Sequence, residues 1–457
     1  MANTFDCNQV PAADVNATQL STVKVCEPVS GSVWQNEQPN EITAYNADYT
    51  SVSRNPISMN RAARKGTVSD IEVAPGFQTD VTISTAEYWI PPFLYSRWTG
   101  GNTLTGNFTS AGEVTLSESF TVPYDLYVTV DGKKYSALKA SNSDSAKLVI
   151  DGLDTATGAA TVEIIGGKPE IAYTSGILTI TDNTFDFPVG SQIFITGKGF
   201  ARIRKKIGAT EYEIDNHDIN GSIVATATDV YFSSFVSNVS QDSDLFERTQ
   251  MTFEARFNTD TVTYQYARAV EANQLTVNAP LTDKMTMDMT FIAQEMQTVT
   301  EALPGAAHVD YLKDEALNTV TNISRVRIAD LDDKGLSTYM KDVTLTINNN
   351  AQGEKVLGKM GSAFTSLGDL EVTVSTETVM TDASVLQAIE NNTSVDFTLA
   401  CKNGDGALLF NIPTATISNG AKSMNRGEKV KISTDLTGYL DANHGFVVGV
   451  SLFKYLP

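Results

Sequence analysis

The fold is decided by one stretch of the sequence, Lys341–Asn392, which reads KDVTLTINNNAQGEKVLGKMGSAFTSLGDLEVTVSTETVMTDASVLQAIENN. Apolar and polar residues alternate over Asp342–Asn348, and the same alternation returns over Asp369–Ser375. A period of two is typical of a strand with one buried and one solvated face. A short helix is expected after the capping cluster Thr381–Ser384, because apolar residues follow it at helical spacing. The stretch therefore predicts a strand, a long loop, a second strand and a short helix.

This order of elements occurs a second time, nearer the N-terminus. Glu41–Thr50 and Thr67–Ile83 are strand-like, and the polar segment Arg54–Gly66 joins them. The aromatic-rich segment Thr85–Trp98 follows, where the other copy has its helix. Internal repetition of this kind indicates a duplicated unit.

Each unit also predicts a hairpin, at Met251–Tyr266 in the first and at Val395–Ile412 in the second. In the second unit the hairpin follows the helix within a few residues, whereas in the first a long segment intervenes. Its portion Gly100–Phe235 has strand-like runs bounded by turn residues, so we expect an inserted small all-β domain. The prediction is mainly β, with two tandem β-sandwich domains, each with a short flanking helix: domain 1 at 1–99 and 236–300, the insert at 100–235, and domain 2 at 301–457.

Composition limits the function. The chain has 457 residues, 41% of them hydrophobic, and a formal net charge of −21. Such a charge repels phosphate, so a conventional role in binding nucleic acid is disfavoured. Two basic clusters run against this trend, and each is interpreted as a solvated face or as a contact with an acidic neighbouring subunit. They are Arg54, Arg61, Arg64 and Lys65, and Arg202, Arg204, Lys205 and Lys206.

The cysteines and the apolar segments indicate a protein made in a cytoplasm. Cys7, Cys26 and Cys401 are odd in number and lack metal-ligand spacing, which favours free thiols. The first residues show no signal peptide, and the most apolar run, Gly445–Phe453, is too short to span a bilayer. We expect no membrane association.

Catalytic and metal-binding motifs are not evident. The histidines lie in different segments and are interpreted as ordinary surface or loop residues: His217, His308 and His444. Asp330–Gly335 resembles the start of a calcium loop, but Lys334 and Lys341 stand where oxygen ligands are needed, so we reject that site. We expect no enzyme activity, no catalytic residue, no cofactor and no metal.

Three stretches resemble the tail tube proteins of long-tailed, non-contractile bacteriophages. They are RNPISMNRAARKGTVSDIEVAPGFQTDVTIS (Arg54–Ser84), the segment Leu345–Asn392, and NQLTVNAPLTDKMTMDMTFIAQEM (Asn273–Met296). The resemblance covers roughly Gln19–Trp98 and Phe246–Pro457 and leaves out the insert, which in such proteins is often a surface decoration.

The resemblance implies a function and an assembly. Tube domains are β-sandwiches flanked by a helix, and a long loop reaches the next ring of the stack. A chain with two such domains is expected to form homotrimeric rings of pseudo-sixfold symmetry, which stack into the hollow tail tube through which phage DNA is ejected. The implied location is the virion tail, and the implied partners are the tape measure protein and the tail terminator and tip proteins. DNA would pass through without specific binding.

Two groups of candidate site residues follow. If the solvated strand faces line the channel, acids on them would repel passing DNA and let it slide. These candidate lumen-facing acids are Asp70, Glu72, Asp80, Glu254, Asp288, Asp342, Asp369, Glu371 and Asp396. The alternative is that these acids solubilise the subunit or pair with Arg54, Arg61 and Arg64 of a neighbour. The two long loops are expected to be poorly packed in a free subunit and to reach a neighbouring ring. Their candidate inter-ring residues are Arg54, Arg61, Arg64, Lys65, Glu354, Lys355 and Lys359.

Other classes of function stay open at this point. A tandem-β surface adhesin fits the strand pattern, although no secretion signal supports it. A carbohydrate-binding or carbohydrate-active protein also fits, but it would be expected to cluster tryptophans and paired acids, and the chain has three Trp.

Overall fold

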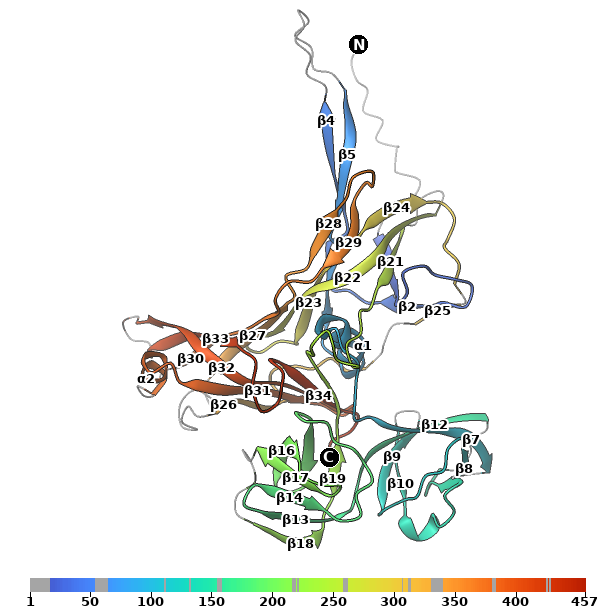
Figure 1. Cartoon of the computed structure of the whole chain (residues 1–457), viewed down its shortest axis with the longest axis vertical. Coiled ribbons are helices and arrows are strands. Elements are labelled where there is room, and N and C mark those ends of the chain that lie inside the picture. The colour runs from blue at the N-terminus through green and yellow to red at the C-terminus, as the bar shows by residue number, and fades with distance from the viewer. Residues whose placement is uncertain are drawn as a thin grey trace, which may run out of the picture.

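The computed structural model describes residues 17–457 except for 54–64, 111, 131–132, 154–157, 216–218, 220–221, 258–261, 306, 311–313, 330–339, 380–383, 425 and 427–428. The chain is mainly β, with two α-helices in the described part. Figure 1 shows three regions: two β-sandwich halves that adjoin each other, and an inserted β domain below them. An arm of two strands, β4 and β5, projects from the first half.

The first half begins near the N-terminus and resumes after the insert. Its strands pair in the order β1–β21–β22–β23–β6–β3, and every neighbouring pair is antiparallel. β2 adds to β1, β24 adds to the early part of β22, and β25 adds to β2 in parallel. The elements are β1 (Ala17–Val23), β2 (Val33–Glu37), β3 (Glu41–Ala44), β4 (Ala47–Ser53), β5 (Gly66–Val73), β6 (Gly76–Asp80), α1 (Ile83–Leu94), β21 (Met251–Phe257), β22 (Thr263–Ala279), β23 (Thr286–Ile292), β24 (Glu295–Val299) and β25 (Ala307–Val309).

The second half repeats this pairing. Its strands run β26–β31–β32–β33–β30–β27, again antiparallel, and β34 adds to β32 as β24 adds to β22. β22 and β32 are both 17 residues long and contribute to both sheets of their sandwich. The elements are β26 (Ile323–Ala329), β27 (Met340–Asn348), β28 (Gln352–Lys355), β29 (Ser362–Ser366), β30 (Glu371–Val379), α2 (Ser384–Glu390), β31 (Ser394–Lys402), β32 (Ala407–Ser423), β33 (Lys431–Gly438) and β34 (Gly449–Phe453).

One sheet crosses the boundary between the halves. The later part of β22 pairs with β27, from Gln274 opposite Asn348 to Ala279 opposite Val343. The strands β32–β33–β30–β27–β22–β23–β6–β3 therefore form one continuous antiparallel sheet. We call it the shared sheet.

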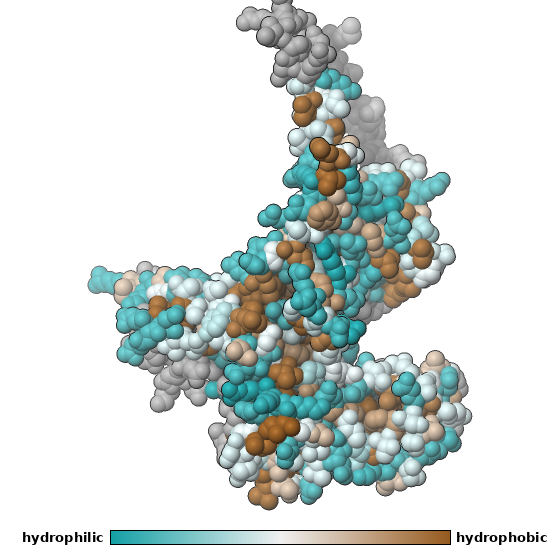
Figure 2. All heavy atoms as spheres, in the orientation of Figure 1, coloured by the Kyte–Doolittle hydropathy of each residue, from teal (hydrophilic) through white to brown (hydrophobic). Residues whose placement is uncertain are grey.

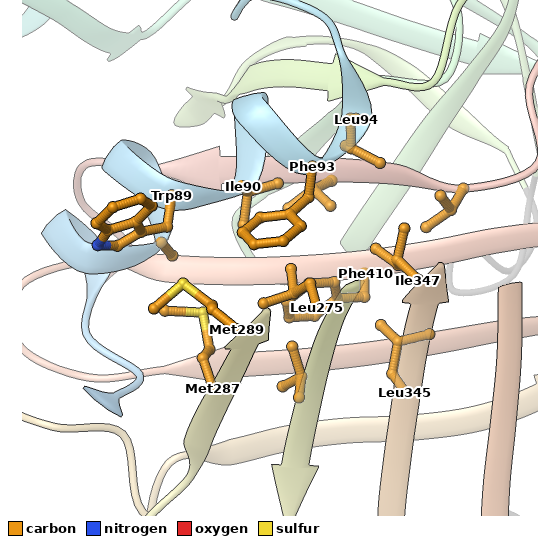
Figure 3. Close-up of a cluster of buried hydrophobic side chains, with 14 of the residues drawn as sticks. Trp89, Ile90, Phe93, Leu94, Leu275, Met287, Met289, Leu345, Ile347 and Phe410 are labelled. Carbon is orange, nitrogen blue, oxygen red and sulfur yellow. The ribbon is translucent and has the colours of Figure 1, made fainter. Parts of the chain in front are cut away.

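The apolar face of the shared sheet carries the core. Helix α1 lies on this face and buries Trp89, Ile90 and Phe93 against side chains from both halves (Figure 3). Thr82 caps the helix in a capping box with Thr85, which satisfies backbone N–H groups of the first turn. Because the helix contributes several fully buried large side chains, it fastens the two halves to one core. The labelled sheet residues in this core are Leu275, Met287, Met289, Leu345, Ile347 and Phe410.

The insert is an all-β domain with its own core. Its strands lie in one separate sheet, and a second hydrophobic cluster fills it. Its ends are adjacent, because Thr99 and Phe235 exchange backbone hydrogen bonds of 2.7 and 2.8 Å. The exit strand β20 (Ser234–Ser237) then pairs with β34 of the second half. The insert comprises β7 (Asn102–Ser110), β8 (Glu113–Leu116), β9 (Leu126–Val130), β10 (Lys133–Ala137), the 3₁₀ turn η1 (Lys139–Ser141), β11 (Lys147–Val149), β12 (Gly158–Gly167), β13 (Glu170–Thr174), β14 (Ile177–Ile180), β15 (Gln192–Ile195), β16 (Gly199–Lys206), β17 (Glu211–Asp215), β18 (Ile223–Ala227) and β19 (Val230–Phe232).

The prediction of a long loop is wrong for residues 349–367. Residues 349–367 hold the hairpin β28–β29, and Asn349 is buried, donating hydrogen bonds to the carbonyls of Phe93 (2.9 Å) and Asn273 (3.2 Å). Residues 54–64 of the predicted first loop lie outside the described part, and the strands β4 and β5 on either side of them pair as an antiparallel ribbon. Polar composition suggested a loop at 349–367, but backbone pairing within this segment makes a hairpin. We call β4–β5 the long arm and β28–β29 the short arm.

Candidate functional site

The solvated face of the shared sheet is the first candidate surface. Its middle strands place Thr276 beside Thr346, with their hydroxyls 3.4 Å apart, and Thr344 donates to Asn278 at 3.3 Å. Alternate residues of the same strands, such as Leu345 and Val277, are buried on the other face. The result is a ladder of hydroxyl and amide side chains with acids among them.

Four of the nine predicted acids lie on strands of this face. Asp288 accepts hydrogen bonds of 2.9 Å from Gln78 and from Asn278, which fixes it on the polar side of β23. Asp80 pairs with Lys284 at 2.8 Å near the end of the sheet that lies away from the arms. Asp342 and Glu371 are exposed on β27 and β30.

For two acids the prediction of a solvated position is wrong. Glu254 is 2% exposed and accepts a 2.5 Å hydrogen bond from the Tyr266 hydroxyl. Asp396 is 6% exposed and forms an ion pair with Arg202 of the insert. Glu254 lies on β21 and Asp396 lies on β31, and both strands are outside the shared sheet. A neighbouring strand or domain covers the face of each strand that alternation alone predicts to be solvated.

The remaining three acids lie beside the arms. Asp70 and Glu72 belong to β5 and form ion pairs with Lys355 of the short arm. Asp369 is exposed just before β30.

Sequence reasoning missed two acids of the solvated face, Glu377 and Asp435. Glu377 lies 3.6 Å from both Lys341 and Lys431, and Asp435 accepts a 2.6 Å hydrogen bond from Ser375. Extending the alternation of β30 by a few residues would have found Glu377. Asp435 required the pairing of β33 with β30, which no local pattern shows.

The two edges of the shared sheet are the second candidate surface. β3 pairs with β6 on one side, and beyond Thr416 β32 pairs with β33 on one side. Within the described residues no strand pairs with the other edge of either segment. Open edges present rows of unpaired N–H and C=O groups that can accept a further strand.

The arms form the third candidate surface. Of the predicted inter-ring residues, Arg54, Arg61 and Arg64 lie outside the described residues, and Lys65 and Glu354 are exposed. Lys359 donates to the side-chain oxygen of Gln294 at 3.3 Å. Both arms expose large apolar side chains, and Figure 2 shows brown patches along the projecting arm. These side chains are Tyr49, Val52 and Val68 on the long arm, and Val356, Leu357, Met360 and Phe364 on the short arm.

The basic cluster in the insert pairs within the chain rather than forming a free basic face. Arg202 is buried between Asp215, at 2.8 Å, and Asp396. Arg204 lies 3.4 Å from Glu213. In the same region His444 lies in a turn, which fits the prediction of a loop residue, but its side chain is 5% exposed and lies 2.9 Å from Asp215 and 2.7 Å from Asp441.

These charges fasten the insert to the second half. Burial alone would raise the pKa of Asp215, but the contacts with His444 and Arg202 hold the pKa well below its usual value. Gln192 of the insert donates to Asn411 of β32 at 2.6 Å. The insert is therefore bonded to the second half by buried polar contacts.

The described residues hold two cysteines, Cys26 and Cys401. The thiols of Cys26 and Cys401 are free, and burial raises the pKa of Cys401 to about 12, so this thiol stays protonated. In the described part of the chain, no three His, Cys, Asp or Glu side chains are grouped so that they could hold a metal ion. No helix in that same part is long and apolar enough to cross a membrane.

A sheet that is solvated on one face and open at both edges, with two arms beside it, defines a structural protein that assembles with copies of itself. The family that fits is shown by sequence: a family model described as phage tail tube protein matches residues 21–438, so the chain belongs to this family. It is a structural component of a phage tail and self-assembles into a tube with other tail components. No curated protein matches the chain.

Proposed function

We propose that three copies of the chain close into a ring of pseudo-sixfold symmetry, and that the rings stack into the hollow tube through which phage DNA leaves. The observation that carries the proposal is the junction between the two halves. There β22 of the first half pairs with β27 of the second half. The strands equivalent to these two are β32 and β3, and their corresponding edges are open.

The register of the closing contact follows from the equivalent strand pairs. Thr344 pairs with Ser375 in the second half, and Ala44 pairs with Gly76 in the first half. Ser375 and Gly76 occupy equivalent positions of β30 and β6, so Ala44 corresponds to Thr344. Asn278 pairs with Thr286 as Ser423 pairs with Lys431, so Ser423 corresponds to Asn278. Asn278 lies opposite Thr344 within the chain. Ser423 of one copy is therefore placed opposite Ala44 of the next copy.

Three copies supply six equivalent halves, and each contact of this kind is head to tail, which closes into a ring when the rotation fits. Closure also removes the open edges that would otherwise favour uncontrolled strand pairing. The number three rests on the two halves in each chain and on the resemblance to tube proteins with duplicated domains.

Engineered disulfides test the register. In a background with Cys7 and Cys26 changed to serine, Ala44→Cys with Ser423→Cys should give covalent dimers and closed trimers under oxidising conditions. The matched control, Asn278→Cys with Thr344→Cys, places the same pair at the junction within one chain and should give monomers only. Opposed residues in antiparallel strands are close enough for a disulfide. Monomers alone from the first variant in assembled tubes would contradict the ring.

We further propose that the solvated face of the shared sheet lines the channel. Asp80, Asp288 and Asp342 are joined there by Glu377 and Asp435. The face offers hydroxyls, amides and acids, and three lysines near its edge away from the arms are paired with acids. Phosphates that pass such a wall form no strong attachment, so DNA slides.

A charge placed on this wall tests its position. Thr346→Lys with Thr373→Lys should slow DNA release from particles, because each ring then offers phosphate a cationic contact. The control Val224→Lys with Thr226→Lys adds the same charge to exposed positions of β18 in the insert and should release DNA at the parent rate. Equal rates for both variants would place the wall elsewhere.

The same proposal extends to stacking and partners. The long arm reaches the neighbouring ring with its exposed apolar side chains, since surfaces of this kind mark contacts between proteins. The insert, 100–235, lies outside the wall as a decoration of domain 1 (1–99 and 236–300), with domain 2 at 301–457. The tape measure protein and the tail terminator and tip proteins are the other partners, and the chain is made in the host cytoplasm.

A further inference from the structure

The two halves share a four-residue motif at the base of their arms. Asp70-Ile71-Glu72-Val73 in the first half corresponds to Asp369-Leu370-Glu371-Val372 in the second half. Strand pairing confirms the match, because Glu72 lies opposite Asp48 and Glu371 lies opposite Asn348, on the strand that precedes each arm tip. The two acids of each motif are separated by one apolar residue, so their carboxylates lie on one side of the backbone.

In the first half this acid pair holds a lysine from the second half. Lys355 of the short arm donates to Glu72 at 2.6 Å and also forms an ion pair with Asp70. The contact with Lys355 lowers the pKa of Asp70 and raises the pKa of Lys355. The short arm lies close to β5, since a Cβ added to Gly361 would be 2.9 Å from the Ile71 side chain. The acid pair of the first half therefore binds the short arm of the second half.

The second motif has the same acids and no such partner in the free chain. Asp369 and Glu371 are exposed, and neither carboxylate forms an ion pair with a described residue. The arm that would follow it in a ring is the long arm of the next copy. Lys65 is exposed at the start of the returning strand β5.

We propose that Asp369 and Glu371 of one copy bind Lys65 on the long arm of the next copy, as Asp70 and Glu72 bind Lys355 within the chain. The inference rests on the proposed ring and adds to it a specific contact between copies. It gives these two acids a structural role at the junction, in place of the role in the channel wall that alternation alone suggests. The contact would neutralise acids at every junction of a chain whose net charge is −21.

Charge reversal tests the contact. Asp369→Lys with Glu371→Lys should lower the yield of Ala44–Ser423 crosslinked trimers by about tenfold at low ionic strength, because attraction becomes repulsion at each junction. The control Asp242→Lys with Asp244→Lys makes the same charge change at exposed acids of the segment after the insert and should leave the yield unchanged. Adding Lys65→Glu to the first variant should restore part of the trimer yield, because it reverses both sides of the contact.

The outcomes separate this inference from the ring itself. Parent crosslinking with no loss in the reversed variant would overturn the contact and leave the ring in place. Failure of the parent to crosslink between copies would overturn both. Thermal unfolding of the monomer decides whether a loss reflects misfolding, and Asp369→Asn with Glu371→Asn then serves as the milder variant. Loss in that variant supports the contact, and an unchanged yield overturns it.

Discussion

The two halves of the chain share one strand order but differ at their arms, their helices and the connection from helix to hairpin. The short arm folds back on the first half and its lysine is paired, whereas the long arm projects and its described lysine, Lys65, has no ion pair with a described residue. Two copies of a domain have the same surroundings only if the assembly repeats the same contacts around both. The second half already contacts the first half through β27 and the short arm, whereas β3 of the first half has an open edge and its long arm projects.

Removing the insert should give the largest effect, and it tests the connection from helix to hairpin. Replacing Gly100–Phe235 with a short linker removes Ser234 and Phe235 of β20, which pair with β34, and exposes apolar side chains that pack against the insert, including Leu409 and Phe453. Exposing a fully buried side chain of this size costs about 1.5–3 kcal/mol. We expect a large fall in the free energy of unfolding, measured by chemical denaturation.

A narrower deletion sharpens that result. Replacing Asn102–Phe232 with a short glycine linker keeps β20, and the ends are close because Gly101 lies beside Ser234. Because this variant keeps the pairing of β20 with β34, it should recover part of the lost stability and still form rings. If both deletions are equally unstable, the loss of β20 is not the cause.

The helices give the next largest effect. Trp89→Ala in α1 should lower the free energy of unfolding by about 3–5 kcal/mol, because the fully buried indole packs against Phe77, Phe253 and Phe291. Ile389→Ala in α2 removes a side chain that is only partly buried, and about 1 kcal/mol is expected. Denaturant titration of both variants measures the contrast, and equal losses would show that the two helices bear equally on their cores.

Sequence patterns predicted the duplicated β plan because it depends on local alternation. The strands at Asp342–Asn348 and Glu371–Ser375 need only a period of two, and that period survives in the fold. Which strand pairs with which leaves no such local pattern in the sequence. The buried position of Asp396 depends on Arg202, far away in the insert, and the buried position of the His444 side chain depends on Asp215 of the insert.

The candidate surfaces follow the same rule. Alternation found the polar face of β27 and β23, but it could not separate acids in the shared sheet from acids in the arms. Asp70 and Asp369 read alike in sequence, and only the pairing of Lys355 with one of them shows what the motif does. The open edges of β3 and β32 follow from the strand pairing, which no local pattern in the sequence shows.

Glu37 gives a smaller effect that is specific to the first half. Burial raises the pKa of Glu37 to about 7, although Thr22 donates to its carboxylate at 2.8 Å and the Trp89 indole at 3.4 Å. Between its ordinary pKa and about 7, the folded protein binds a proton that the unfolded chain releases, so stability falls as pH rises through this window. The expected fall is roughly 1–3 kcal/mol.

Glu37→Gln should remove that pH dependence, measured as the midpoint of chemical denaturation at several pH values. Glu27→Gln, at an exposed position of the same half, serves as the control and should keep the parent profile. A Glu37→Gln profile that still falls across the window would assign the effect to another group.

The smallest effect concerns the arms. In the monomer, Lys355→Gln removes an exposed ion pair and should lower the free energy of unfolding only slightly, and less at high salt. The lowered pKa of Asp70 has the same origin, so the stability it contributes is present at neutral pH and lost as pH falls through the folded pKa.

Asp369→Asn with Glu371→Asn should leave the monomer unchanged, because these acids have no ion pair among the described residues of one copy. In assembled rings both variants should destabilise, since both acid pairs then hold a basic side chain. Thermal unfolding of monomers and rings, at low and high salt, measures this difference, and an equal effect of the Asp369 and Glu371 changes in both states would contradict it.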